Sequence, residues 1–75
     1  MSKHEDQYPF KGNGKEMGVT YVMSSGTAKL QRSGGGTWVD VPSSSYSASA
    51  DFTIYAPTNA EFRFVLTGDA EAYTH

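Results

Sequence analysis

Apolar and polar residues alternate with a period of two along much of this chain, which is the pattern of half-buried β-strands. The pattern is clearest in a strand, a glycine-rich turn and a second strand that together span Gly26 to Pro42. The turn, Ser33-Gly34-Gly35-Gly36, supplies residues that tolerate the positive φ of a tight hairpin. An isolated hairpin is only marginally stable in water, so we expect this one to be the centre of a larger sheet.

The same alternation predicts further strands over residues 18–23, 51–55 and 61–67, and a short last strand over 70–74. The serine-rich stretch after Pro42 is too poor in apolar residues for a core strand, so we expect a connection between sheets with Tyr46 on its surface. No helical period exceeds one turn. The fold class is therefore all-β, a small antiparallel β-sandwich or barrel of five or six strands. The predicted core consists of Val19, Tyr21, Met23, Leu30, Val39, Val41, Phe52, Ile54, Phe62, Phe64 and Leu66.

Residues 1–17 differ in composition from the rest, because six of them are charged and Pro9, Gly12 and Gly14 interrupt regular structure. We therefore divide the chain into an N-terminal arm, 1–17, extended or disordered, and a β-sandwich domain, 18–75. A terminal arm is disordered unless it is tied down. Alternatively, Tyr8-Pro9-Phe10 is a pre-extended aromatic plug that docks in a groove of a neighbouring subunit.

Trp38 is the residue most informative about function. If Val39 and Val41 face the core, strand parity places Trp38 on the outer face together with Asp40. The alternative is that Trp38 faces the core and the two valines are exposed. With Trp38 outward, the same parity gives a mixed aromatic, aliphatic and basic surface, the composition of interface hot spots. Its other outward members are Val22, Lys29, Tyr55, Arg63 and Val65. The candidate partner-binding residues are Tyr8, Phe10, Lys11, Trp38, Tyr55 and Arg63.

The composition of the chain limits the classes of binding partner that we expect. The net charge is −2, from six basic and eight acidic residues that are scattered along the chain, so we expect neither nucleic acid nor an anionic membrane as a partner. No apolar run is long enough for a membrane span or a signal peptide, and we expect synthesis in a cytoplasm. Cysteine is absent, which excludes disulfides and Cys-ligated zinc. A chain of 75 residues buries little surface, and this one has neither a disulfide nor a Cys-ligated zinc to stabilise it. We therefore expect a homo-oligomer, a dimer or trimer.

The residues give no sign of an enzyme, a cofactor or a metal site. The acidic residues are dispersed without a spacing typical of acid–base catalysis, and the two histidines lie at opposite ends of the chain. The segment Gly12-Asn13-Gly14-Lys15 fails as a phosphate-binding loop, because Pro9 and Glu16 occupy positions that the motif gives to Gly and to Ser or Thr. We expect a non-enzymatic protein.

A resemblance covers roughly residues 19–73. The hairpin G-T-A-K-L-Q-R-S-G-G-G-T-W-V-D-V, followed by F-T-I-Y and E-F-R-F-V-L-T-G, resembles the small β-sandwich virion proteins of tailed bacteriophages, especially cement or decoration proteins. The resemblance implies a structural protein on the capsid surface, assembled in the host cytoplasm, that bridges subunits of the major capsid protein. Two alternatives stay open: a carbohydrate-binding β-sandwich module of a tail or adhesion apparatus, with Trp38 and Tyr55 stacking on sugar rings, and a tail or head–tail completion protein.

Overall fold

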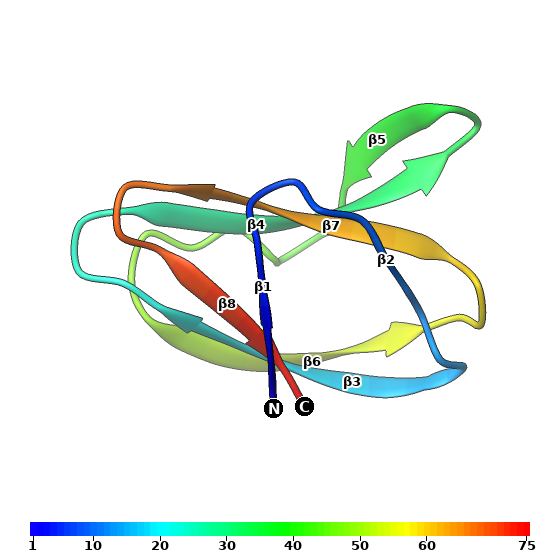
Figure 1. Ribbon diagram of the computed structural model, residues 1–75, viewed down its shortest axis with the longest axis horizontal. Coiled ribbons are helices and arrows are strands. Elements are labelled where there is room, and N and C mark those ends of the chain that lie inside the picture. The colour runs from blue at the N-terminus through cyan, green and yellow to red at the C-terminus, as the bar shows by residue number, and fades with distance from the viewer.

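The computed structural model describes residues 1–75 and contains eight β-strands and no helix (Figure 1). They form two four-stranded antiparallel sheets, with the orders β1-β8-β3-β6 (sheet 1) and β2-β7-β4-β5 (sheet 2). The all-β prediction is confirmed, and the two separate sheets exclude a closed barrel. The strands are β1 (Ser2–His4), β2 (Phe10–Lys11), β3 (Lys15–Val22), β4 (Thr27–Gly34), β5 (Thr37–Asp40), β6 (Ala50–Ala56), β7 (Glu61–Thr67) and β8 (Glu71–Thr74).

The predicted count of five or six strands is too low, because the N-terminal segment adds two. Strand β1 pairs with β8 and β2 pairs with β7, so the segment crosses from sheet 1 to sheet 2 over one open side of the body (Figure 1). These strands are only three and two residues long, too short to show an alternation of side chains. The ring of Phe10 lies 5.4 Å from that of Phe64, centroid to centroid. Phe10 thus packs against the chain's own core. The sequence left two alternatives for this segment, a disordered arm and an aromatic plug in a neighbour's groove, and in the structure the segment is ordered on its own sheets.

The core lies between the two sheets and follows the predicted alternation in β3, β4 and β7. The largest fully buried side chains include Tyr21, Leu30 and Phe64. The prediction that Val39 belongs to the core is wrong, because its side chain is 57% exposed. The pairing of β4 with β7 ends at Arg32, whereas its pairing with β5 continues to Gly34. The hairpin therefore projects beyond the sheets (Figure 1), which leaves the inward-facing side chain of Val39 largely exposed.

The connection between β5 and β6 is more buried than the sequence indicates. Ser44 is fully buried, and its hydroxyl bonds both the N–H and the C=O of Leu30 at 3.1 Å. Tyr46, expected on the surface, forms a bridge with Ala28, and its ring stacks on that of Phe52 at 5.5 Å. The Ser44 hydroxyl thus serves the N–H of Leu30, whose C=O also accepts from the backbone N–H of Val41 at 2.9 Å. Through the packing of Tyr46 on Phe52, the connection closes part of the open side between β5 and β6.

A carboxylate joins the turns at one end of the body. Asp69, between β7 and β8, accepts hydrogen bonds from the backbone N–H groups of Ser24, Ser25 and Gly26 at 3.0–3.1 Å and from the Ser24 hydroxyl. These bonds, the Ser24 hydroxyl foremost, lower the pKa of Asp69 to about 2. Gly26 is required there, because a Cβ on it would lie 2.1 Å from the carbonyl oxygen of Thr67.

We expect Asp69→Asn to lower the melting temperature near neutral pH. We also expect the melting temperature of this variant to fall less steeply than that of the wild type as the pH is lowered. The folded-state pKa of Asp69 is about 2, below the roughly 3.9 of an unfolded aspartate, so the carboxylate stabilises the fold above about pH 4 and the contribution is lost as the pH falls toward 2. Thermal unfolding followed by circular dichroism across this window measures the effect. Glu5→Gln, at an exposed position, is the control. If Asp69→Asn and the wild type lose stability in parallel as the pH falls, the hydrogen bonds of the Asp69 carboxylate contribute nothing to the free energy of unfolding.

Candidate functional site

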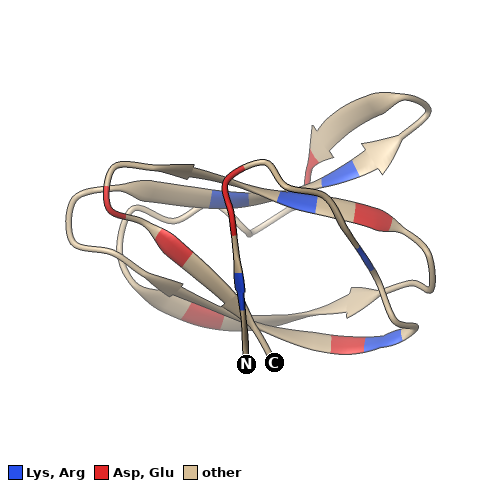
Figure 2. Cartoon of the chain, viewed as in Figure 1, with Lys and Arg blue, Asp and Glu red and all other residues tan.

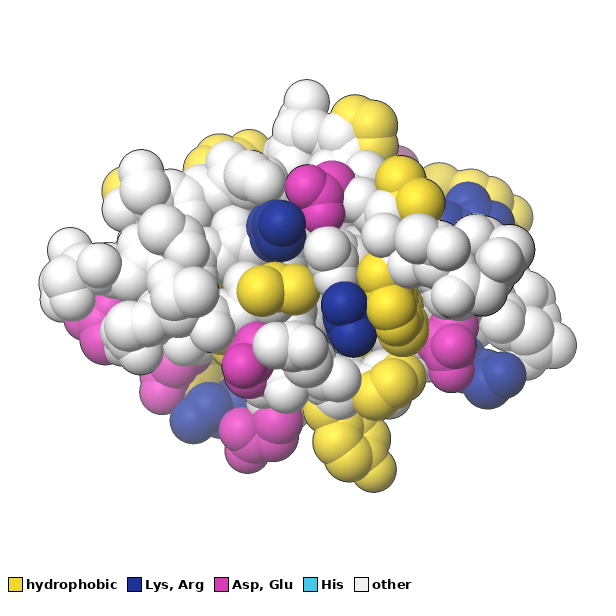
Figure 3. Space-filling view, turned by 90° about the horizontal axis from the view of Figure 1, so that it is seen from above, with side chains coloured by type: hydrophobic (Ala, Val, Ile, Leu, Met, Phe, Trp, Pro, Cys, Tyr) yellow, Lys and Arg dark blue, Asp and Glu magenta, His cyan; other side chains and the backbone are white.

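The outer face of sheet 2 brings together most of the residues that the sequence places outward around Trp38. Two antiparallel registers, β4 with β5 and β4 with β7, align them: Gln31 lies opposite both Asp40 and Arg63, and Ser33 lies opposite Trp38. Figure 3 looks onto this side of the molecule, where apolar side chains lie among basic and acidic ones. We call this surface the Trp38 face. It consists of Lys29, Gln31, Ser33, Trp38, Asp40, Arg63 and Val65.

The centre of the Trp38 face is a stack of Arg63 on the indole ring. The guanidinium carbon of Arg63 lies 4.4 Å from the centroid of the Trp38 ring, which is a cation–π contact. The Arg63 Nε donates to Gln31 Oε1 at 2.8 Å, which fixes the plane of the guanidinium. Both Trp38 and Arg63 are half-buried by these contacts while they remain on the surface.

Gln31 extends this contact to a carboxylate. Its Nε2 donates to Asp40 Oδ1 at 2.9 Å, and the ammonium of Lys29 lies 3.3 Å from the same oxygen. The hydrogen bond from Gln31, followed by that from Lys29, lowers the pKa of Asp40 below its ordinary value. A continuous chain of contacts therefore runs from Lys29 to Trp38. Sequence reasoning missed Gln31, because its link to Arg63 depends on β4 and β7 being neighbours although they are far apart in the sequence.

The other candidate residues lie elsewhere. Lys11 is on the same side of sheet 2, at its edge, opposite Glu61. Tyr55 is 63% exposed and lies, like Val22, on the outer face of sheet 1. The single outward surface expected from parity is thus divided, because parity separates inside from outside and does not say on which sheet a residue lies. Tyr8, 70% exposed, lies between β1 and β2.

Charge is distributed unevenly between the two sheets (Figure 2). The strands of sheet 2 carry four basic and two acidic residues, a net charge of +2. The remaining residues carry two basic and six acidic ones, a net charge of −4. Arg32 lies on the inner side of sheet 2, opposite Val39 and Phe62. The outer face that bears Trp38 therefore has a net charge of +1, from Lys11, Lys29 and Arg63 against Asp40 and Glu61. This small excess of positive charge favours a partner surface with acidic character.

The histidines form no catalytic arrangement. His4 is half-buried against Phe10 and bonds the Thr74 hydroxyl at 2.7 Å, and burial lowers its pKa. His75 Nε2 lies 2.9 Å from the Thr20 hydroxyl, which itself donates to Asp51, so His75 is not placed as a base toward that hydroxyl. No group of three or more His, Cys, Asp or Glu side chains is placed to hold a metal ion. The structure has no helix long and apolar enough to cross a membrane.

No protein-family model matches this sequence, and no curated protein or solved structure is measurably similar to it. A functional assignment therefore depends on the geometry of the Trp38 face and on the sequence resemblance stated above. The face offers a preformed array of an indole, two cations, an amide and a carboxylate, which suits recognition of another surface.

Proposed function

We propose that this chain is a non-enzymatic structural protein that binds other protein subunits through the Trp38 face. The observation that carries the proposal is the stack of Trp38 and Arg63, both half-buried, on the outer face of sheet 2. Tryptophan and arginine are the residue types most enriched at binding hot spots. The sequence resemblance supports the class of partner, the major capsid protein of a tailed bacteriophage, and hence the role of a capsid cement protein on a β-sandwich fold.

The polar network strengthens this proposal, because it orders the side chains before a partner arrives. Arg63 is held by Gln31, and Gln31 is held in turn by Asp40. Long side chains that are already ordered lose less conformational entropy on binding, so more of the contact energy appears as affinity. The small positive charge of the outer face of sheet 2 favours an acidic patch on a capsid subunit as its partner.

A sugar-binding module is the alternative that one observation favours. Asp40 and Gln31 place hydrogen-bonding groups beside the indole, as a carbohydrate platform requires. However, the guanidinium of Arg63 covers a face of the ring on which a sugar would stack. A tail or head–tail completion protein would use the same surface and differs from cement only in its partner.

The test separates protein from sugar as the ligand. Trp38 is the only tryptophan, so its fluorescence reports on this face alone. We expect a saturable change in Trp38 emission, and co-sedimentation of the protein, when assembled capsid shells lacking it are added. A panel of oligosaccharides is expected to cause no change. Saturable quenching by a sugar without co-sedimentation would replace the proposal with the carbohydrate alternative.

A further inference from the structure

Strand β6 is a long sheet edge with little of the protection that edge strands normally have, since its only charged residue is Asp51. It pairs with β3 over all seven residues from Ala50 to Ala56, and it lies at the end of sheet 1. The other edge strands, β1, β2 and β5, are three, two and four residues long. Natural proteins shield edges by short length, lysine, proline or a bulge. The sequence of β6, ADFTIYA, has neither lysine nor proline, and its pairing with β3 is continuous.

The free edge of β6 presents the backbone groups of alternate residues. Gly18 exchanges both of its backbone hydrogen bonds with His75, at 2.9 and 3.0 Å, so its polar groups point toward β8. Gly18 lies directly opposite Thr53. In an antiparallel ladder such a pair is not hydrogen-bonded, so the N–H and C=O of Thr53 point away from β3, toward the free edge. The same alternation applies to Asp51 and Tyr55, two residues away on either side.

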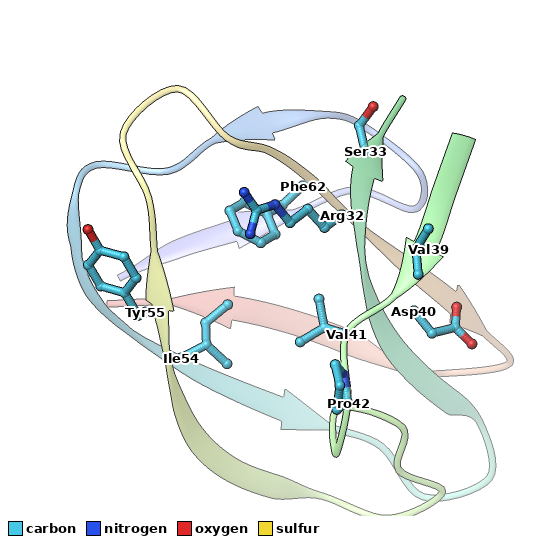
Figure 4. Close-up of a pocket in the computed structure, with 10 residues that line it drawn as sticks. Arg32, Ser33, Val39, Asp40, Val41, Pro42, Ile54, Tyr55 and Phe62 are labelled. Carbon is cyan, nitrogen blue, oxygen red and sulfur yellow. The ribbon is translucent and has the colours of Figure 1, made fainter. Parts of the chain in front are cut away.

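An apolar groove adjoins the second half of this edge. It has a volume of about 430 Å³ and lies between β6 and the projecting hairpin of β4 and β5. Figure 4 shows Ile54 from β6 and Val41 pointing toward one another across it. The N-terminal segment crosses the opposite open side of the body, whereas here the connection through Tyr46 closes only the half near Phe52.

We infer that a second copy of this chain pairs with β6 in antiparallel, about a two-fold axis at Thr53. This register pairs all seven residues of the strand and brings the outward-pointing backbone groups of both copies together. It places Thr53 opposite itself, Asp51 opposite Tyr55 and Phe52 opposite Ile54. Like charges never face each other, and the aromatic and β-branched pairs are those that stabilise antiparallel sheets. The interface is self-complementary, as a two-fold dimer requires.

The shape of the open side supports this partner. Because antiparallel pairing reverses the second copy, the half that the connection closes in one copy lies next to the open half of the other. Phe52 of the second copy thereby lies beside Ile54, at the mouth of the groove. A continuous sheet across the axis leaves the same face of both copies on one side. The dimer therefore presents two Trp38 faces together, and this last consequence rests on the proposed function, since it makes binding to a repeating lattice bivalent.

Sedimentation velocity of the purified protein over a range of concentrations tests the inference. We expect a dimer for the wild type and a monomer for Thr53→Pro, with unchanged circular dichroism. The N–H that proline removes points to the free edge, where proline is tolerated. A wild type that stays monomeric, or forms a trimer, would overturn the inference. So would a Thr53→Pro variant that is as dimeric as the wild type.

A cysteine variant keeps the test decisive if Thr53→Pro fails to fold. The chain has no cysteine, so Thr53→Cys introduces a single thiol next to the axis. Under mild oxidation we expect it to form a covalent dimer at least tenfold faster than Ser45→Cys, whose thiol is on an exposed loop position. Equal rates would contradict the two-fold at Thr53. A monomer that still co-sediments with shells would refute the dimer alone and leave the proposed function standing.

Discussion

Phe64→Ala is expected to abolish the cooperative unfolding transition of this protein. The Phe64 side chain is fully buried, and its ring centroid lies 5.3 Å from His4, 5.4 Å from Phe10 and 5.8 Å from Tyr21. Truncating a buried phenylalanine costs about 3–5 kcal/mol, which is most of the stability of a marginal small domain, roughly 5 kcal/mol. Urea unfolding followed by circular dichroism and by Trp38 fluorescence measures the loss.

Tyr8→Ala is the matched control, because it removes an aromatic ring that is 70% exposed. We expect it to change the free energy of unfolding by no more than about 0.5 kcal/mol. If the two variants unfold at the same urea concentration, the rings around Phe64 do not form the core of the folded protein.

Trp38→Ala is expected to weaken binding to assembled capsid shells by about thirtyfold or more, equivalent to about 2 kcal/mol. The indole lies on the outer face of sheet 2 against Arg63, outside the core between the sheets, so the variant should remain folded. Shell affinity is measured by co-sedimentation, and the fold by circular dichroism.

Two further variants test whether the binding depends on the Trp38 face of sheet 2 and on the stack of Arg63 on Trp38. Val22→Ala changes an exposed side chain on the outer face of sheet 1 and should leave shell affinity unchanged. Arg63→Lys keeps the positive charge but loses the planar stack on Trp38, so its affinity should fall between those of the wild type and Trp38→Ala. A Trp38→Ala variant that binds as tightly as the wild type would remove the Trp38 face from the mechanism.

The alternation of side chains allowed much of the body to be predicted, because it is a local property of each strand. All six strands expected after residue 17 are present, and Val19, Tyr21, Leu30 and Phe64 are buried as expected. Parity allowed two orientations of β5 and did not choose between them; in the structure Trp38 lies on the outer face, against Arg63. The prediction that Val39 is buried was wrong, although its side chain does lie on the inward side of β5. The hairpin projects beyond the body, so its inward side is exposed.

The features that escaped prediction depend on which segments become neighbours. The order β2-β7-β4-β5 joins strands that are distant in the sequence, and the contact of Gln31 with Arg63 exists only in that order. Asp69 reaches the turn at Ser24 for the same reason. β1 and β2 have too few residues for a pattern, and their place is set by backbone pairing with β8 and β7.

Under the proposed function the chain is a component of phage virions, and its copy number in purified particles tests this central claim most directly. Quantitative mass spectrometry of such virions is expected to find the chain in a fixed ratio to the major capsid protein, equal to one or a simple fraction of it. A few copies per particle would move the protein to the tail or the head–tail junction. Its absence from the particles would contradict the account.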